Sequence, residues 1–205
     1  MSVEQRRTGG VRVPVVEEAQ AEGRTAELYA RLKEMMGVPF VPDLFTLLGT
    51  KPDLLQATVF GVATLGAEGA LSRRLKELIA AWTARLNQCE YCVGTHNYFL
   101  RRFGGSADLA EAVAASSSVD DLPVDERERA LLALVSKVTT AATRIGDADW
   151  EGARAAGWSE EELLEAVFTA ALFNFVVRLV DSFGLSTAMT RSKVSGLPAS
   201  APGNG

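Results

Sequence analysis

Both cysteines and the only histidine of this 205-residue chain fall within one short stretch, as Cys89, Cys92 and His96. If a helix begins near Cys89, these side chains follow one another at steps of three and four residues and share one helix face. Cysteines of Cys-x-x-Cys motifs at helix starts have thiol pKa values lowered from about 8.5 to as little as about 3.5. A nucleophilic thiolate, a second thiol and a base one turn further on are the components of two-electron thiol redox chemistry.

Glu77 precedes this motif in the spacing Glu-x11-Cys-x2-Cys-x3-His. If helices over residues 72–87 and 89–103 pack as a pair, Glu77 approaches His96, orients its imidazole and completes a Glu–His–Cys proton relay. Plainer interpretations stay open. The cysteines could be small buried hydrophobes. A zinc site with Glu77 as fourth ligand is disfavoured, because no second cysteine pair exists. Glu77 itself could be solvated or paired with Arg73, Arg74 or Arg85.

Helical periodicity dominates the chain and strand alternation is nearly absent, so we predict an all-α fold. One helix ends at Gly37, and another begins at Pro52. Ser72 caps the helix that carries Glu77, whose solvent side holds Arg73, Arg74 and Lys76. Capping boxes at residues 125–128 and 159–162 begin two later helices.

We expect a flexible arm over residues 1–15, one all-α domain over 16–192 and a disordered tail over 193–205. Residues 115–124 form a Ser/Asp-rich connection between two helical halves. A polar stripe of Asn174, Arg178 and Asp181 recurs at helical spacing in an apolar segment. We interpret it as an Arg178–Asp181 pair that fixes helix register or lines a subunit interface, with a substrate-pocket role as the alternative.

Composition narrows the function classes. Lys+Arg 21 against Asp+Glu 26, with mixed signs, argues against nucleic-acid or anionic-membrane binding. The most apolar run, residues 167–177, is shorter than the about 20 residues that a bilayer requires, and the N-terminus lacks a signal-like apolar region. We therefore predict a cytoplasmic protein without a membrane span. Neither a GxGxxG nor a P-loop motif occurs, so no cofactor is predicted, and no metal.

The spacing from Glu77 to His96 resembles the signature of the AhpD-like alkylhydroperoxidases, within the carboxymuconolactone decarboxylase superfamily. Three flanking segments are also similar to that family: PDLLQA (52–57), LSRRLKELIAAWTARLNQ (71–88) and GWSEEELLEAVFTAALFNFVVRLVDSFG (157–184). The resemblance covers roughly residues 20–190 and implies an AhpD-like helical bundle.

The resemblance also implies roles for the matching residues. Cys92 would be the peroxidatic thiolate, Cys89 would resolve it by forming the Cys89–Cys92 disulfide, and His96 and Glu77 would carry the proton relay. Tyr91 stands where well-characterised AhpD proteins have a second histidine, which makes the chain similar to the peroxidase-related branch. The implied activity is a thiol-dependent (alkyl)hydroperoxide reductase.

The implied partners are a peroxide substrate and a thiol or dithiol-protein reductant. The resemblance also implies a homo-oligomer, as a trimer or hexamer, with a dimer as a further possibility. Two alternatives remain: a non-redox enzyme like carboxymuconolactone decarboxylase, whose members generally lack the cysteine pair, or a non-enzymatic interaction protein that responds to redox state.

Overall fold

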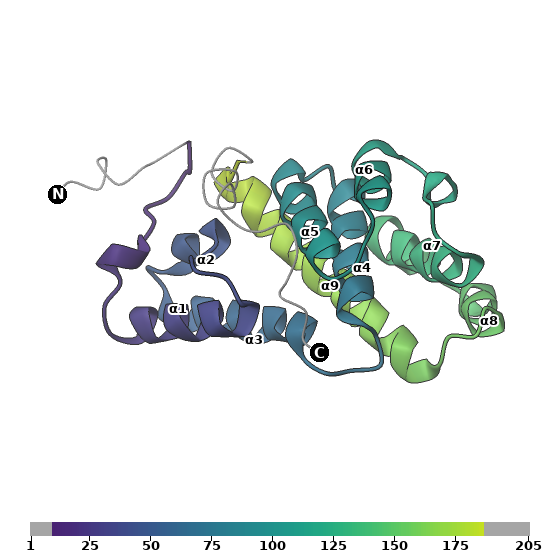
Figure 1. Ribbon diagram of the computed structural model, residues 1–205, viewed down its shortest axis with the longest axis horizontal. Helices are drawn as coiled ribbons and strands as arrows, with labels where there is room; N and C mark the ends of the chain where they lie inside the picture. The colour runs from purple at the N-terminus through teal and green to yellow at the C-terminus, as the bar shows by residue number, and fades with distance from the viewer. Residues whose placement is uncertain (1–9, 187–205) are drawn as a thin grey trace. The chain divides into compact units, whose positions relative to one another are not determined.

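The computed structural model describes residues 10–186, which form two compact units (Figure 1). The first unit holds residues 10–67 and 178–186 and the second holds residues 68–177. The last helix of the described chain, α9 (Glu160–Phe183), contributes residues to both. The candidate site residues all belong to the second unit.

The first unit is built from three helices, α1 (Gly23–Met36), α2 (Asp43–Leu48) and α3 (Pro52–Gly66), which follow the short 3-10 helix η2 (Glu18–Gln20). Both α1 and α2 pack against α3. The buried hydroxyl of Tyr29 lies 2.9 Å from the carbonyl oxygen of Val16 and 3.2 Å from that of Phe45. Tyr29 therefore fastens the segment before α1 to α2.

Residues 10–15, part of the arm expected at the N-terminus, contact the end of α9. Val11 and Val15 are buried, and the backbone N–H of Arg12 donates to the carbonyl oxygen of Phe183 at 2.9 Å. Residues 1–9 and the tail predicted over 193–205 lie outside the described residues. The expectation of one domain over residues 16–192 stays a prediction.

The second unit is arranged around α4 (Arg73–Leu86), in which every residue from 75 to 84 is buried. Three helices pack against α4, and α9 crosses it at an angle (Figure 1). The indole N–H of Trp82, at the centre of the core, donates to Ser136 Oγ at 2.8 Å. The other elements of the unit are α5 (Glu90–Arg102), α6 (Ala107–Ala115), η3 (Val119–Asp121), α7 (Glu126–Thr140), η4 (Ala142–Arg144) and α8 (Asp147–Ala155).

The all-α prediction is confirmed for residues 10–186, which contain no strand. Gly37 ends α1 in the left-handed conformation, and Pro52 lies in the first turn of α3. Ser72 caps α4 by accepting a hydrogen bond from the backbone of Leu75 at 3.3 Å. The helices α2, α6 and α8, with six, nine and nine residues, are too short for the periodicity to predict.

The prediction that Lys76 lies on the solvent side of α4 is wrong. Its side chain is 1% exposed and forms an ion pair with Glu165 of α9, with Nζ 2.6 Å from Oε1. The second carboxylate oxygen of Glu165 accepts the backbone N–H of Leu71 at 2.6 Å. Because α9 covers this side of α4, the lysine is buried and its charge is balanced by a carboxylate.

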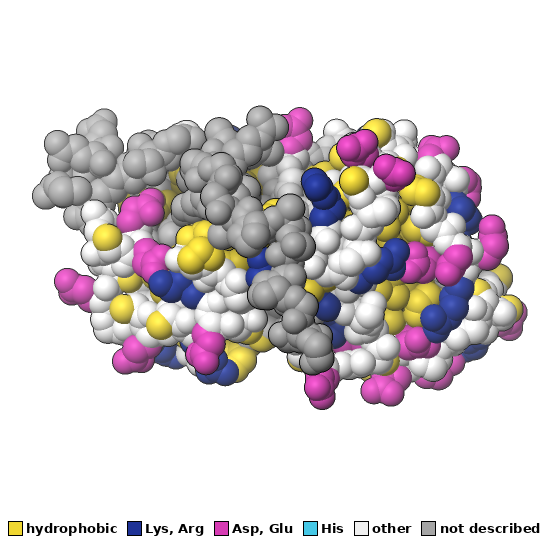
Figure 2. Space-filling view, viewed as in Figure 1, with side chains coloured by type: hydrophobic (Ala, Val, Ile, Leu, Met, Phe, Trp, Pro, Cys, Tyr) yellow, Lys and Arg dark blue, Asp and Glu magenta, His cyan; other side chains and the backbone are white. Residues whose placement is uncertain are grey.

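By length and composition alone, the 24-residue α9 is apolar enough to cross a membrane. The apolar run over residues 167–177 is thus only the middle part of this helix. Its Glu165 and Phe173 contact α4 and α5, and core helices of globular proteins meet the same two criteria. On the face of the molecule seen in Figure 2, charged side chains of both signs are interspersed.

Candidate active site

A tight turn between α4 and α5 positions the first cysteine. Gln88 adopts a left-handed conformation with φ 60°, and its N–H donates to the carbonyl oxygen of Arg85 at 3.0 Å. The N–H of Cys89 donates to the carbonyl oxygen of Ala84, also at 3.0 Å. These two bonds form a Schellman motif, which ends α4 and leaves Cys89 as the N-cap of α5.

The register of α5 places the remaining site residues on one helix face. Cys92 is the third residue of α5, and His96 follows one turn later. Cys89, Cys92 and His96 expose only 0%, 2% and 8% of their surface. The two cysteines are not joined by a disulfide. Cys92 lies in the first turn of α5, where unpaired backbone N–H groups and the helix dipole carry a partial positive charge.

Glu77 of α4 meets His96 of α5 in the protein interior. Glu77 Oε2 lies 2.7 Å from His96 Nδ1, and Glu77 has no solvent exposure. The other oxygen, Oε1, accepts hydrogen bonds from Arg73, with Nε at 2.8 Å and Nη2 at 2.7 Å. Two interpretations of Glu77 therefore hold together, since one oxygen pairs with an arginine of its own helix and the other faces the imidazole.

The imidazole of His96 is held from a second side by α9. The ring of Phe173 packs edge to face against it, with ring centroids 4.4 Å apart. The sequence offered no signal for this contact, because Phe173 is one of several apolar residues in its helix. The carboxylate and the aromatic ring together restrict the orientation of the imidazole.

This arrangement can move a proton. When His96 donates its Nδ1–H to the carboxylate, Nε2 keeps a lone pair and can act as a base. Residues four apart on a helix are neighbours, with Cβ atoms about 5–6 Å apart. The Cys92 thiol is thus within reach of the imidazole, directly or through one water. The structure brings Glu77 and His96 together, while the catalytic roles of all four residues stay predictions.

The carboxylate of Glu77 is engaged by Arg73 and His96, so it is not directed at the cysteines as a fourth zinc ligand. Within residues 10–186, no group of three or more His, Cys, Asp or Glu side chains is placed to hold a metal ion.

The polar stripe of α9 divides between two environments. Asn174 links three helices: it accepts from Asn87 Nδ2 at 3.0 Å, and its own amide donates to Thr139 Oγ1 at 3.2 Å. Arg178 and Asp181 are both exposed. Asn174 is therefore a packing residue that joins α9 to the end of α4 and to α7.

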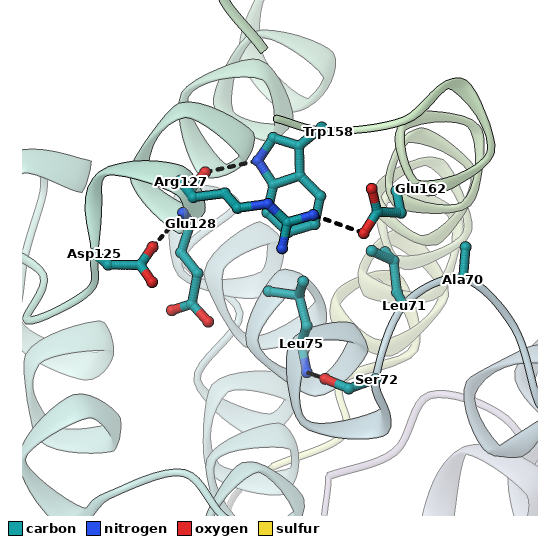
Figure 3. A pocket seen from close by; sticks show the side chains of 9 residues that line it. All are labelled: Ala70, Leu71, Ser72, Leu75, Asp125, Arg127, Glu128, Trp158 and Glu162. Carbon is teal, nitrogen blue, oxygen red and sulfur yellow. Dashed lines mark hydrogen bonds and ion pairs between the residues drawn. The ribbon is translucent and has the colours of Figure 1, made fainter. Parts of the chain in front are cut away.

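A separate cavity of about 260 Å³ lies where the first turns of α4, α7 and α9 approach one another (Figure 3). Arg127 lies over the indole ring of Trp158, 3.6 Å from its centroid, and reaches Glu162 at 2.7 Å. None of the four candidate site residues lines this cavity. Its lining consists of Ala70, Leu71, Ser72, Leu75, Asp125, Arg127, Glu128, Trp158 and Glu162.

Comparison with known proteins gives a family match for part of the chain. The model of the carboxymuconolactone decarboxylase family matches residues 52–124, a segment that contains all four candidate site residues. No curated protein gives a significant match to the sequence.

Solved structures resemble the chain over most of its length. An uncharacterised peroxidase-related protein from Ralstonia eutropha JMP134, described as an alkylhydroperoxidase AhpD core, is 27% identical with a TM-score of 0.78, over 88% of this chain and 93% of that one. A peroxidase-related protein from Silicibacter sp. TM1040 is 22% identical with a TM-score of 0.73, over 88% and 95%. The debrominase Bmp8, in complex with 2,3,4-tribromopyrrole, is 19% identical with a TM-score of 0.72, over 94% and 98%.

The last two likenesses show the fold alone. The family match over residues 52–124 and the Ralstonia structure together support an AhpD-like member of the carboxymuconolactone decarboxylase superfamily. Because the family match contains the candidate site and the Ralstonia structure is described as peroxidase-related, the comparisons support a peroxidase-related or antioxidant function.

Proposed function

We propose that this protein is a thiol-dependent (alkyl)hydroperoxide reductase in which Cys92 attacks the peroxide. The observation that carries the proposal is the buried Glu77–His96 contact, made one helical turn beyond Cys92. A carboxylate–imidazole pair of this kind has a ready use beside a nucleophile, since it keeps the imidazole in the tautomer that accepts the nucleophile's proton.

In the proposed reaction, His96 takes the proton of the Cys92 thiol. The thiolate attacks the oxygen that bears the hydrogen of the hydroperoxide, an S–O bond forms and the O–O bond breaks. The alkoxide leaves as an alcohol with the proton from His96, and Cys92 becomes a sulfenic acid. The Cys89 thiol then attacks that sulfur, which forms the Cys89–Cys92 disulfide and releases water. A thiol or dithiol donor returns two electrons and restores both thiols.

Peroxide consumption by Cys92→Ser and Cys89→Ser variants tests the proposal, with dithiothreitol as reductant. We expect Cys92→Ser to be inactive. After peroxide treatment, the intact mass of the wild type should fall by two hydrogens, and this loss should be absent in Cys89→Ser. A Cys92→Ser variant that consumes peroxide as fast as the wild type would overturn the assignment. A persistent sulfinic product in the wild type would remove Cys89 as the resolving thiol.

The burial of Cys92 affects the choice of substrate for this test. With 2% of its surface exposed, the thiol is shielded from bulky reagents. Hydrogen peroxide and cumene hydroperoxide should therefore be compared at equal concentrations. Turnover of hydrogen peroxide alone would point to a narrow passage, whereas failure with both substrates would contradict peroxidase function.

The tribromopyrrole complex of Bmp8 does not transfer to this chain, because at 19% identity the likeness concerns the fold alone. The two earlier alternatives give distinct results in the same test. A non-redox enzyme would retain its thiols after peroxide treatment. A redox-responsive interaction protein would form the disulfide once, without turnover.

The proposal also extends to partners and location. We propose a homo-oligomer in the cytoplasm that draws electrons from a thiol or dithiol protein. Exposed apolar residues of α9, Leu164, Phe168 and Phe175, recur at helical spacing and support a self-contact. Light scattering coupled to gel filtration measures the mass of the assembly directly.

A further inference from the structure

Three basic residues near the start of α4 each pair with a different carboxylate. Arg74 pairs with Glu128 of α7, and Lys76 pairs with Glu165 of α9. Arg73 pairs with Glu77, the carboxylate that contacts His96. We propose that Arg73 is a positioning residue of the thiol site, which keeps Glu77 ionised and turns its carboxylate toward His96. This inference deepens the proposed function, since it concerns the same site.

Burial makes the charge of Glu77 depend on a nearby cation. An ionised carboxylate without solvent is costly unless a positive group and hydrogen bonds compensate it, and otherwise it takes up a proton. Glu77 has 0% exposure, and the guanidinium of Arg73 lies 2.7 Å from its Oε1. Because a guanidinium keeps its charge at every pH of interest, Arg73 supplies this compensation throughout. An ionised Glu77 then accepts the Nδ1–H of His96.

The geometry of the pair also selects which oxygen faces the imidazole. Both Nε and Nη2 of Arg73 point at Oε1 of Glu77, at 2.8 and 2.7 Å. The carboxylate is thereby fixed about its terminal bond, with Oε2 toward His96 at 2.7 Å. A lysine in place of Arg73 would keep the positive charge beside Oε1, with one nitrogen in place of two.

Arg73 is itself held in place by α5. Its guanidinium lies over the ring of Phe103, 4.7 Å from the centroid, and Phe103 stacks on Phe99 with ring centroids 6.4 Å apart. Phe103 is the C-cap of α5. The arginine therefore joins the first turn of α4 to the last turn of α5, and the same two helices carry Glu77 and His96.

The charged groups around Glu77 define what the substitution changes. Arg73 faces Glu77 from α4 and His96 faces it from α5, while Glu128 of α7 and Glu165 of α9 face Arg74 and Lys76. Removing Arg73 leaves Glu77 without its cation. Arg74 is a matched control, because it lies on the same helix with a similarly exposed side chain and its partner is not in the site.

The experiment compares Arg73→Met, Arg73→Lys and Arg74→Met by two readouts that need no peroxide. The first is the ¹⁵N chemical shifts of the only histidine in the chain, which report its tautomer. The second is the pH dependence of Cys92 alkylation by iodoacetamide, followed by peptide mass spectrometry. For Arg73→Met we expect loss of the Nδ1–H tautomer and an alkylation midpoint higher by about one pH unit.

For Arg74→Met we expect both readouts to match the wild type. Arg73→Lys should keep the tautomer, because it keeps the charge, and it stays informative if Arg73→Met fails to fold. The proposal is overturned if Arg73→Met retains the Nδ1–H tautomer and the wild-type midpoint, or if Arg73→Lys loses the tautomer. Because neither readout requires turnover, a failure of peroxidase activity leaves this test intact.

Discussion

Glu77 and His96 lie on different helices and meet at 2.7 Å between Oε2 and Nδ1, in a part of the core where Glu77 has no solvent exposure. A carboxylate only accepts hydrogen bonds, so the shared proton belongs to Nδ1 when the imidazole is neutral. The contact therefore determines which ring nitrogen remains basic. It also depends on a third residue, since Arg73 engages the other oxygen of Glu77.

Glu77→Gln should reverse the tautomer of His96. Arg73 will keep the amide oxygen, so the amide NH₂ group will face Nδ1 and donate to it. Nε2 then carries the proton and can no longer accept one from Cys92. We expect alkylation of Cys92 at neutral pH to slow by on the order of 100-fold, and the histidine ¹⁵N shifts to exchange. Glu128→Gln, in the partner of Arg74, is the control and should change neither; an unchanged tautomer in Glu77→Gln would contradict the relay.

Gln88→Gly should stabilise the protein. Gln88 holds φ at 60°, a conformation that costs most residues about 1 kcal/mol and glycine almost nothing, and its side chain is exposed. We expect the free energy of unfolding to rise by about 1 kcal/mol, measured by urea denaturation at constant m value. Gln88→Ala is the matched control and should be nearly neutral. A glycine variant no more stable than the alanine variant would show that the turn is not strained.

Local sequence patterns predicted the helices of the site because all four site residues lie on two helices that follow one another in the chain. Two consecutive helices joined by a tight turn must lie side by side, so the distance from Glu77 to His96 along the chain nearly determines their contact. The cap at Ser72 and the start of α5 at Cys89 likewise depend on residues adjacent to them in the sequence.

Contacts between distant helices could not be predicted in this way. Only one of the two hydrogen bonds of the capping box expected at Asp125 is formed, in which the Asp125 side chain accepts from the backbone N–H of Glu128. The Glu128 carboxylate does not return to Asp125 and instead pairs with Arg74 of α4. The sequence around Lys76 predicts a lysine that faces solvent, whereas in the structure α9 covers its side chain. In both cases the partner is set by the packing of helices far apart in the sequence.

The Lys76–Glu165 pair predicts an asymmetry between its two partners. Glu165→Gln leaves a lysine with 1% side-chain exposure without its anion, and we expect a loss of about 3 kcal/mol in the free energy of unfolding. Lys76→Met replaces the charge with an apolar chain of similar size and leaves Glu165 bound to the N–H of Leu71, so we expect a loss below about 1 kcal/mol. Urea denaturation measures both, and equal losses would refute the asymmetry.

The buried Tyr29 should make the first unit lose stability at alkaline pH. Burial, followed by the nearby Glu17 and Glu18, raises the pKa of Tyr29 well above its ordinary value. Its contribution is therefore fully present below about pH 10 and is lost as the pH rises toward the folded-state pKa. Tyr29→Phe should also destabilise by about 1–2 kcal/mol, because it removes the donor that Val16 and Phe45 share.

Tyr98→Phe is the control for this prediction. The Tyr98 hydroxyl is buried and has no hydrogen-bond partner, so its removal should be neutral or stabilising. Absorbance at the phenolate band during alkaline titration of both variants assigns the ionisation. If the Tyr29→Phe variant retains the most alkaline tyrosine transition of the wild type, the assignment to Tyr29 is wrong.

The first turn of α9 predicts the acid limb of stability. Glu162 accepts the backbone N–H of Ser159 at 2.8 Å and pairs with Arg127 at 2.7 Å. The backbone hydrogen bond from Ser159, followed by the bonds from Arg127 and the Ser159 side chain, lowers the pKa of Glu162. Its stabilisation is thus present above the ordinary glutamate pKa of about 4.3 and is lost as the pH falls through the lower folded-state value.

Glu162→Gln keeps the shape of this side chain without its charge, so its difference from the wild type should be largest near neutral pH and shrink below about pH 4. Thermal melts followed by circular dichroism across this range measure the difference. Glu161→Gln removes a charge from the same turn and leaves the Ser159 bond intact, so its difference from the wild type should stay nearly constant. A lowered pKa of Glu162 requires the stability difference between Glu162→Gln and the wild type to shrink as the pH falls. A difference that grows on acidification would show that Glu162 is not the source of the acid-labile stability.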